Sequence, residues 1–232
     1  MKYKMSNEFN KEFVDSNLMG PNAMKMLEEM LLEIEIKPKM RILDLGCGKA
    51  LTSLLLAKNY DVNVFALDLW ISATENYQRI KEFDLEDKIF PIHCDANELG
   101  FANEYFDLII SIDSYHYYGN NTDYLKKLEP LLKNDGKIVI VVPGVKTEED
   151  NIFEKFKEFI TEETFNIYSM QWWLHNFKNS NVMKVIKNKE LACYDEAWQQ
   201  WLETDNEFGI DDRPMMNKVG KLMNLIGFVL EK

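Results

Sequence analysis

The chain has 232 residues, of which 46% are hydrophobic and 28% are charged. That length favours one domain, at about 100–200 residues per domain, and the composition is ordinary for a soluble globular protein. The formal charge is −12, from 27 Lys plus Arg against 39 Asp plus Glu. Because negative charge opposes association with phosphate backbones and anionic membranes, we expect no nucleic-acid partner and no membrane partner.

The cysteines and the apolar runs indicate the compartment. Cys47, Cys94 and Cys193 are an odd number without paired ligand spacing, which argues against a disulfide framework and against a zinc site. No stretch approaches the roughly 18 apolar residues of a membrane span, and Met1–Asn10 shows no secretory signal. We therefore expect a cytoplasmic protein that holds no metal.

The first predicted element is a helix at Pro21–Ile36, where apolar residues recur at spacings of three and four. Short apolar runs then alternate with helical patterns. Strands are predicted at Arg41–Leu45, Val62–Leu67, Ile89–Cys94, Asp107–Ile112 and Lys137–Val142, and helices at Leu51–Lys58, Ala73–Phe83 and Tyr124–Leu132. The turn signal Asn134–Gly136 precedes the fifth strand, and Pro143-Gly144 is expected to end it. This alternation predicts an α/β fold with a parallel sheet and helices on both faces.

The pattern weakens after Gly144. Helices are predicted there at Asp150–Thr161, Ser169–Asn176 and Asp195–Glu203, and strands at Val182–Ile186 and Met223–Leu230. We expect residues 1–232 to form a single domain with three parts. These are an N-terminal helical lid (1–36), a cofactor-binding core (37–145), and substrate-covering helices with closing strands (146–232).

Two glycines join the first strand to the first helix of the core. Gly46 and Gly48 allow either a tight turn or the close approach of a nucleotide-like ligand to the backbone. Asp68 ends the second strand twenty residues after Gly48, where a carboxylate can accept the hydroxyls of a ribose. The combination favours a nucleoside-containing ligand.

Two further residues argue against a dinucleotide. Leu51 occupies the third glycine position of the G-x-G-x-x-G pattern. Asp44, inside the strand before the loop, would repel a pyrophosphate, whereas it could help to hold the amino group of an amino-acid moiety. The alternative is that Asp44 only braces the loop.

The stretch Asp44–Ala50, with sequence DLGCGKA, resembles the first motif of the class I S-adenosylmethionine-dependent methyltransferases, and the chain is most similar to bacterial stand-alone enzymes that act on small molecules. Ala50 stands where that motif has its third glycine. The resemblance continues through Asp68, Asp95-Ala96 and Asp113, over about Met40–Pro143. It implies a Rossmann-like, doubly wound and mostly parallel seven-stranded sheet, whose antiparallel last strand is Met223–Leu230.

The resemblance implies S-adenosylmethionine as cofactor. Asp68 would bind the ribose and Asp95-Ala96 the adenine edge, although Asp95 could instead be a helix N-cap. Trp70 would lie against the adenine or ribose, or pack in the core. Cys47 is expected to contribute only its backbone. The expected cofactor-binding residues are Asp44, Gly46, Cys47, Gly48, Asp68, Leu69, Trp70, Asp95, Ala96 and Asp113.

The acceptor is expected beside Ser111–Tyr118, which leaves the carboxyl end of the fourth strand. His116 is the candidate general base, with a hydrogen-bonding loop histidine as the alternative. Asp113 could orient the acceptor or contact the methionyl part of the cofactor. Tyr115 and Tyr117 could line the acceptor pocket or pack beneath the loop. Trp172 and Trp173 are further candidates, although aromatic spacing of three and four is more often that of a core.

We therefore expect an enzyme, monomeric or homodimeric, that transfers a methyl group to a small-molecule acceptor by in-line displacement. Ser16–Asn22 is a candidate lid over the cofactor. The alternatives are a non-catalytic S-adenosylmethionine-binding protein, a nicotinamide-dependent oxidoreductase, against which Leu51 and Asp44 count, and a methyltransferase acting on protein or RNA.

Overall fold

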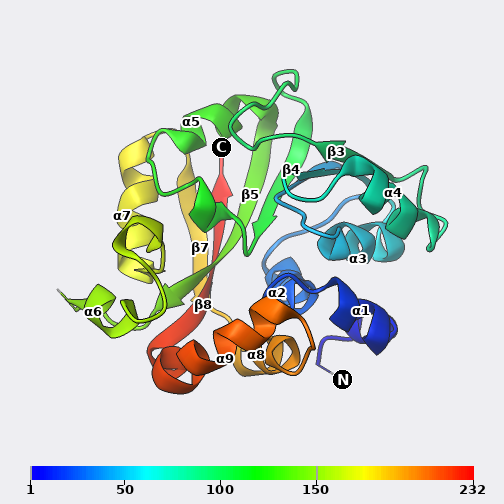
Figure 1. The fold of residues 1–232 in the computed structure, drawn as a ribbon. Helices are drawn as coiled ribbons and strands as arrows, with labels where there is room; N and C mark the ends of the chain where they lie inside the picture. The colour runs from blue at the N-terminus through cyan, green and yellow to red at the C-terminus, as the bar shows by residue number, and fades with distance from the viewer. Residues whose placement is uncertain (1, 150) are drawn as a thin grey trace.

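A single twisted sheet runs through the computed structural model, which describes residues 2–149 and 151–232 (Figure 1). The strand order is β3-β2-β1-β4-β5-β8-β7, and the two-residue β6 pairs with β5 outside this path. The first five strands are parallel, whereas β8 is antiparallel to both β5 and β7. The strands are β1 (Arg41–Leu45), β2 (Asn63–Asp68), β3 (Ile89–His93), β4 (Phe106–Ile112), β5 (Leu132–Val145), β6 (Tyr168–Ser169), β7 (Lys184–Glu190) and β8 (Met223–Glu231).

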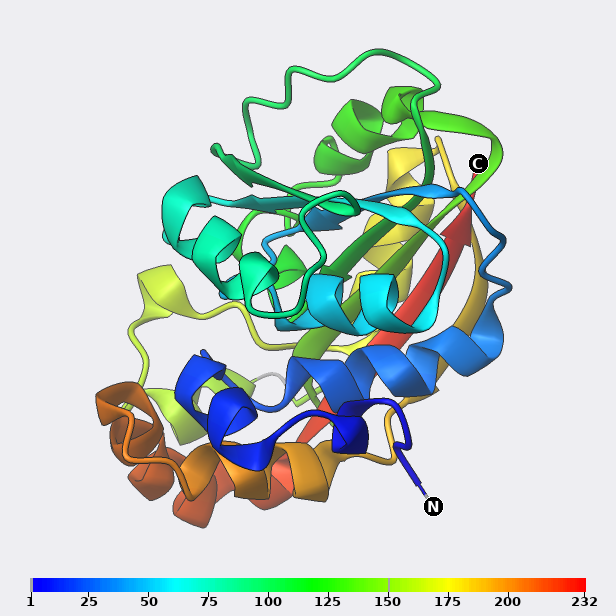
Figure 2. The same cartoon turned by 90° about the vertical axis from the view of Figure 1, so that its right-hand side faces the viewer.

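Helices cover both faces of this sheet (Figures 1 and 2). Apolar side chains of α2, α3 and α8 share one buried cluster, and those of α5 and α7 share the cluster on the opposite face. The predicted Rossmann-like, doubly wound fold, with seven strands in the main path and an antiparallel last strand, is confirmed. The helices are α1 (Lys11–Asn17), α2 (Ala23–Met30), α3 (Leu51–Asn59), α4 (Ala73–Lys81), α5 (Tyr124–Leu128), α6 (Ile152–Phe156), α7 (Met170–Ser180), α8 (Tyr194–Leu202) and α9 (Glu207–Val219).

The central strands form because their residues are apolar on both faces. In β1, Ile42 faces one cluster while Leu43 and Leu45 face the other. The predicted strand Arg41–Leu45 is confirmed to the residue, and the other core strands agree within one or two residues at most ends.

The predicted end of the fifth strand is wrong. β5 continues through Pro143 and Gly144 to Val145, and Pro143 lies opposite Leu225 of the antiparallel β8. The turn expected at Asn134–Gly136 does not end a strand, because β5 runs through it. The pairing with β4 is irregular there: its register shifts between Leu132 and Lys137. A proline ends a strand only where a backbone N–H is needed for the hydrogen bonds to the neighbouring strand.

No bounds were predicted for α1, which lies within the expected helical lid, and α9 was not expected at all. Pro214 lies inside α9, which contradicts the usual exclusion of proline from helix interiors. In place of the predicted helix Asp150–Thr161 the structure has the short α6 and a turn, and Asp150 itself lies outside the described residues.

The N-terminal segment crosses the carboxyl end of the sheet and packs against the orange helices near the C-terminus (Figure 2). The side chain of Asn22 donates to Gln200 of α8 at 2.8 Å, and Gln200 in turn donates to Asp15 at 2.7 Å. These contacts bring Asn17–Pro21 over the end of β1. Among the described residues, no helix has the length and apolar character that crossing a membrane requires.

Candidate functional site

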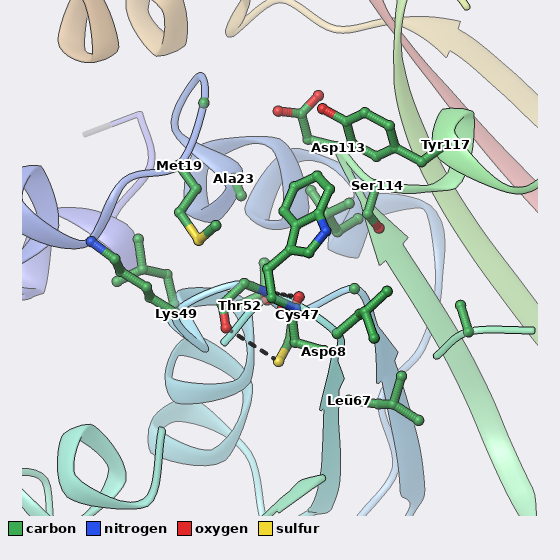
Figure 3. A pocket seen from close by; sticks show the side chains of 18 of the residues that line it. Met19, Ala23, Cys47, Lys49, Thr52, Leu67, Asp68, Asp113, Ser114 and Tyr117 are labelled. Carbon is green, nitrogen blue, oxygen red and sulfur yellow. Dashed lines mark hydrogen bonds between the residues drawn. The ribbon is translucent and has the colours of Figure 1, made fainter. Parts of the chain in front are cut away.

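A cavity of about 260 Å³ lies where β1, β2 and β4 end at the carboxyl edge of the sheet (Figure 3). Parallel α/β sheets bind their ligands at this edge, where the strand order reverses. Four loops and the N-terminal segment form its wall. The lining residues are Asn17, Leu18, Met19, Gly20, Pro21, Ala23, Gly46, Cys47, Gly48, Lys49, Leu51, Thr52, Leu67, Asp68, Leu69, Trp70, Cys94, Asp95, Ala96, Asn97, Ile112, Asp113, Ser114, Tyr117 and Tyr118.

The glycine loop after β1 forms the floor of this cavity. Gly46 has φ +74°, and a Cβ on it would lie 2.5 Å from the Cβ of Ser114. Both the conformation and the contact therefore require glycine there. Ala50, at the position of the third glycine of the motif, also has a positive φ of 61°. The alanine is tolerated at some backbone strain.

Asp68 holds the loop after β2 and the glycine loop together. One carboxylate oxygen accepts from the backbone N–H of Gly48 at 2.8 Å, and the other accepts from the N–H groups of Trp70 and Ile71 at 2.8 and 2.9 Å. A carboxylate has about four acceptor positions. About one therefore remains for a ribose hydroxyl, whereas the sequence predicted that Asp68 accepts both hydroxyls.

Asp44 does not reach the cavity wall, so the expectation that it faces the ligand is corrected. It is buried, and one of its oxygens accepts from the hydroxyls of Thr52 and Ser53 at 2.6 Å each. Burial raises the pKa of Asp44 to about 6, against those two hydrogen bonds. The structure supports the bracing alternative, in which Asp44 ties β1 to the start of α3.

The other residues expected at the cofactor lie around the cavity. Asp95 and Ala96 line it. Asp95 also accepts from the backbone N–H of Asn97 at 2.7 Å, but this bond closes a turn, and no helix begins in the described residues between β3 and β4, so the helix N-cap alternative is wrong. Trp70 is 65% exposed and meets Tyr117 edge-on at 5.3 Å, which removes the core alternative. Leu69 is also exposed and lines the cavity.

Cys47 lines the cavity between the two glycines. Its side chain is buried, and burial raises the pKa of its thiol well above the ordinary range. A thiol held in that protonated form is a poor nucleophile. The backbone N–H of Cys47 donates to Leu67 O at 3.0 Å, which joins the loop to β2.

Asp113 and Tyr117 are the acceptor candidates that line the cavity (Figure 3). Asp113 has a positive φ of 57°, a strained backbone that turns the chain at the end of β4. Burial and the neighbouring Asp212 carboxylate raise the pKa of Asp113 to about 8. A Cβ on Gly20 would lie 2.7 Å from the Asp113 Oδ2 atom, so the N-terminal segment closes directly on this carboxyl.

Four other acceptor candidates do not line the cavity. Tyr115 and Trp173 are fully buried and meet edge-on in the cluster beneath α7, at 5.8 Å between ring centroids. Trp172 stacks on Tyr168 at 3.9 Å. His116 is buried, and desolvation lowers its pKa to about 3, so it is a weak base. None of the four is a lining residue, although His116 packs on the lining residue Tyr117 at 4.1 Å between ring centroids. Their contact with the acceptor stays a prediction.

Several lining residues were missed from the sequence. Met19 and Gly20 come from the stretch that the sequence marked only as a candidate lid. Ser114 and Tyr118 lie in the segment after β4, and both hydroxyls donate to the carbonyl of Leu45, at 2.8 and 3.1 Å. Lys49 also lines the cavity, and nothing in the sequence indicated this except that it directly follows Gly48.

The chain resembles known methyltransferases in sequence. Residues 43–140 match the family model described as "Methyltransferase domain". A phosphoethanolamine N-methyltransferase of Plasmodium falciparum is 23% identical over 203 residues, which are 85% of this chain and 73% of that enzyme. The chain spans only about a third of the longer phosphoethanolamine N-methyltransferases of plants.

Solved structures agree in fold. Phosphoethanolamine N-methyltransferase 2 of Haemonchus contortus, in complex with phosphomonomethylethanolamine and S-adenosylhomocysteine, has a TM-score of 0.74 at 17% identity, covering all of this chain and 58% of that one. The [4+2]-cyclase SpnF also has a TM-score of 0.74, at 10% identity over all of this chain and 96% of that one.

The matched methyltransferase domain covers the glycine loop, Asp68, Asp95 and Asp113, the residues that surround the cavity. The match over residues 43–140 confirms the predicted resemblance to the S-adenosylmethionine-dependent methyltransferases, and S-adenosylmethionine is the cofactor that this resemblance implies. The cavity suits this cofactor: it offers carboxylates at Asp68 and Asp95, a glycine loop without side chains, and the apolar Leu69 and Ala96.

Proposed function

We propose that this chain transfers a methyl group from S-adenosylmethionine to a small-molecule acceptor that binds at the Asp113 end of the cavity. The observation that carries the proposal is the closure of the N-terminal segment over the end of β4, where Gly20 approaches Asp113. The same cavity, of about 260 Å³, also holds the residues proposed for the cofactor, so only its Asp113 end is left for the acceptor. Closure of that end by the N-terminal segment favours a small acceptor over a protein side chain or an RNA base.

The proposed roles of the residues follow from their places. Asp68 and Asp95 would hold the nucleoside end, and the loop Gly46–Gly48 would lie along the methionyl part. When bound, the cofactor supplies a methyl group on a positively charged sulfur. The segment Asn17–Pro21 excludes water and fixes the acceptor in line, and such positioning supplies much of the acceleration.

Methyl transfer is tested directly by the formation of S-adenosylhomocysteine with a panel of small amines, alcohols and thiols. We expect one chemical class to raise the rate at least about ten-fold over the rate without acceptor, and we expect Asp113→Asn to lower that rate. The exposed Asp205→Asn on the α8–α9 connection serves as a control.

The alternative is a protein that binds the cofactor without transferring its methyl group. It would be supported if S-adenosylmethionine binds normally while every acceptor leaves S-adenosylhomocysteine at the background level. The same result would contradict the proposed function.

A further inference from the structure

Arg79, in the last turn of α4, is a half-buried cation without a negative partner. Among residues 2–149 and 151–232, no carboxylate oxygen lies within 4.0 Å of its guanidinium nitrogens. A guanidinium that is partly removed from water without an ion pair costs free energy. Its N–H donors are directed at neutral oxygens instead, and those oxygens connect the N-terminal segment to the glycine loop.

Two side-chain amides accept the hydrogen bonds of Arg79. Its Nε donates to Asn17 Oδ1 at 2.8 Å, and its Nη1 donates to Asn76 Oδ1 at 3.1 Å. Asn17 is the last residue of α1 and lines the cavity, whereas Asn76 is a buried residue of α4. A planar guanidinium presents its donors in a fixed arrangement, so it sets the positions of both oxygens at once.

Asn76 continues these hydrogen bonds to the glycine loop. Its Nδ2 donates to the carbonyl of Gly48 at 2.9 Å, and the N–H of Gly48 donates to Asp68 at 2.8 Å. Asn76 is only 1% exposed, so water cannot replace these partners. Arg79 is therefore one side chain away from the loop that is proposed to lie along the methionyl part of the cofactor.

Lys49 holds the same turn of α1 from the glycine loop itself. Its Nζ donates to the carbonyl of Ser16 at 3.0 Å, and in Figure 3 its side chain extends toward the N-terminal segment and away from Asp113. The segment that follows this turn lies against the loop, since a Cβ on Gly48 would be 3.0 Å from Met19 Sδ. The part of the chain that closes the cavity is thus attached directly before it begins.

We propose that Arg79 is a positioning residue for methyl transfer, which keeps the segment Asn17–Pro21 closed over the bound cofactor by joining Asn17 to the glycine loop through Asn76. This inference rests on the proposed function and names the residue that holds the closed segment. Arg79 is not among the described residues that line the cavity, so it acts through Asn17 and not on the ligand. Opening of the segment breaks the bond from Arg79 to Asn17, and loss of that bond therefore speeds release of the ligand.

The test is surface plasmon resonance of the whole chain with S-adenosylhomocysteine. Arg79→Ala should release the ligand about ten-fold faster and change the rate of binding by less than about three-fold, because a closed segment mainly opposes departure. Asn17→Ala should speed release at least as much. In the Asn17→Ala background, Arg79→Ala should add less than about two-fold, since the contact between the two residues is already lost.

Two further variants separate the position of the donors from the charge. Arg79→Lys keeps the positive charge but loses the planar pair of donors, so it should restore only part of the slow release. Lys81→Ala is the matched control, because it removes a positive charge from an exposed position in the same turn of α4. It should leave the release rate unchanged.

Release from Arg79→Ala at the wild-type rate, equal acceleration in Lys81→Ala, or a full effect of Arg79→Ala in the Asn17→Ala background would overturn the inference. Wild-type release from Arg79→Lys would overturn it as well, because charge alone would then suffice. If Arg79→Ala does not fold, Arg79→Lys with and without Asn17→Ala gives the same comparison. If S-adenosylhomocysteine does not bind the wild type, the proposed function falls together with the inference; if it binds and only the acceleration is absent, the positioning role alone is wrong.

Discussion

Single residues set the shape of the site through backbone conformation and buried charge. Gly46 is required by its positive φ and by its contact with Ser114. Asp44 was expected at the ligand from its place in the motif, and the structure shows it bonded to two hydroxyls of α3 instead. The motif predicted that a carboxylate belongs at this position, but the direction in which it points depends on the helix that follows.

Gly46→Ala should lower the free energy of unfolding by more than about 2 kcal/mol. A non-glycine residue at φ +74° is strained, and its Cβ would lie 2.5 Å from Ser114. Urea unfolding measures the change. Gly100→Ala is the control, because a Cβ there has no heavy atom within 4 Å, and we expect it to change stability by less than about 1 kcal/mol. Similar losses in both variants would contradict the account of the loop.

The free energy of unfolding of Asp44→Asn, relative to that of the wild type, should increase as the pH rises. Burial raises the pKa of Asp44 from 3.8 to about 6, so the folded state binds more protons than the unfolded state between these values. Wild-type stability therefore falls through that window, by about 3 kcal/mol at two pKa units, and the variant lacks this loss.

The comparison uses urea unfolding at pH 4, 5, 6 and 7. Groups other than Asp44 titrate in both proteins and cancel in the difference. The exposed Asp87→Asn is the control for loss of one negative charge. A difference between wild type and Asp44→Asn that stays constant from pH 4 to 7 would show that Asp44 is not a buried, destabilised carboxylate.

At the scale of elements, the core strands were predictable because burial on both faces leaves near-continuous apolar runs. β1 and β4 are examples. The helix α9 was not predictable, since Pro214 lies inside it and packing against α8 overrides the propensity. The aromatic spacing around Trp173 indicated a helix correctly, and its ring is buried in the core, which is the usual outcome of that spacing.

The start of α2 connects stability to the site. Asn22 caps this helix by accepting from the N–H groups of Met24 and Lys25, and its amide also donates to Gln200. Asn22→Ala should cost about 1–3 kcal/mol of stability and weaken binding of S-adenosylhomocysteine, because Gly20 and the segment before it lose their anchor.

Asn10→Ala offers a matched comparison in the same part of the chain. Asn10 caps α1 with a single exposed hydrogen bond to the N–H of Phe13. Its loss should cost about 1 kcal/mol at most and leave ligand affinity unchanged. Thermal unfolding and calorimetry on both variants measure the two effects. Equal ligand affinity in the two variants would contradict the anchoring role of Asn22.

At the scale of the whole molecule, the site is assembled from segments that are far apart in the sequence. The glycine loop and Asp68 could be predicted because a βαβ unit brings them together within a short stretch. The packing of α9 against α6 could not, since it joins segments far apart in the sequence. The position of the N-terminal segment was predicted only in part. The sequence indicated Ser16–Asn22 as a candidate lid, and the structure shows that Gly20 lies against Asp113.

The most direct test of the central claim, that the cavity binds S-adenosylmethionine, is thermal unfolding with S-adenosylmethionine, S-adenosylhomocysteine and NAD on the wild type and on Asp68→Ala. At a hundred times the dissociation constant a ligand adds about 2.7 kcal/mol, which corresponds to about 5–10 °C in Tm for a chain of this size. The account predicts that shift with both sulfur compounds, none with NAD, and a smaller shift in Asp68→Ala. A shift with NAD alone, or no shift with any of the three in folded protein, would contradict it.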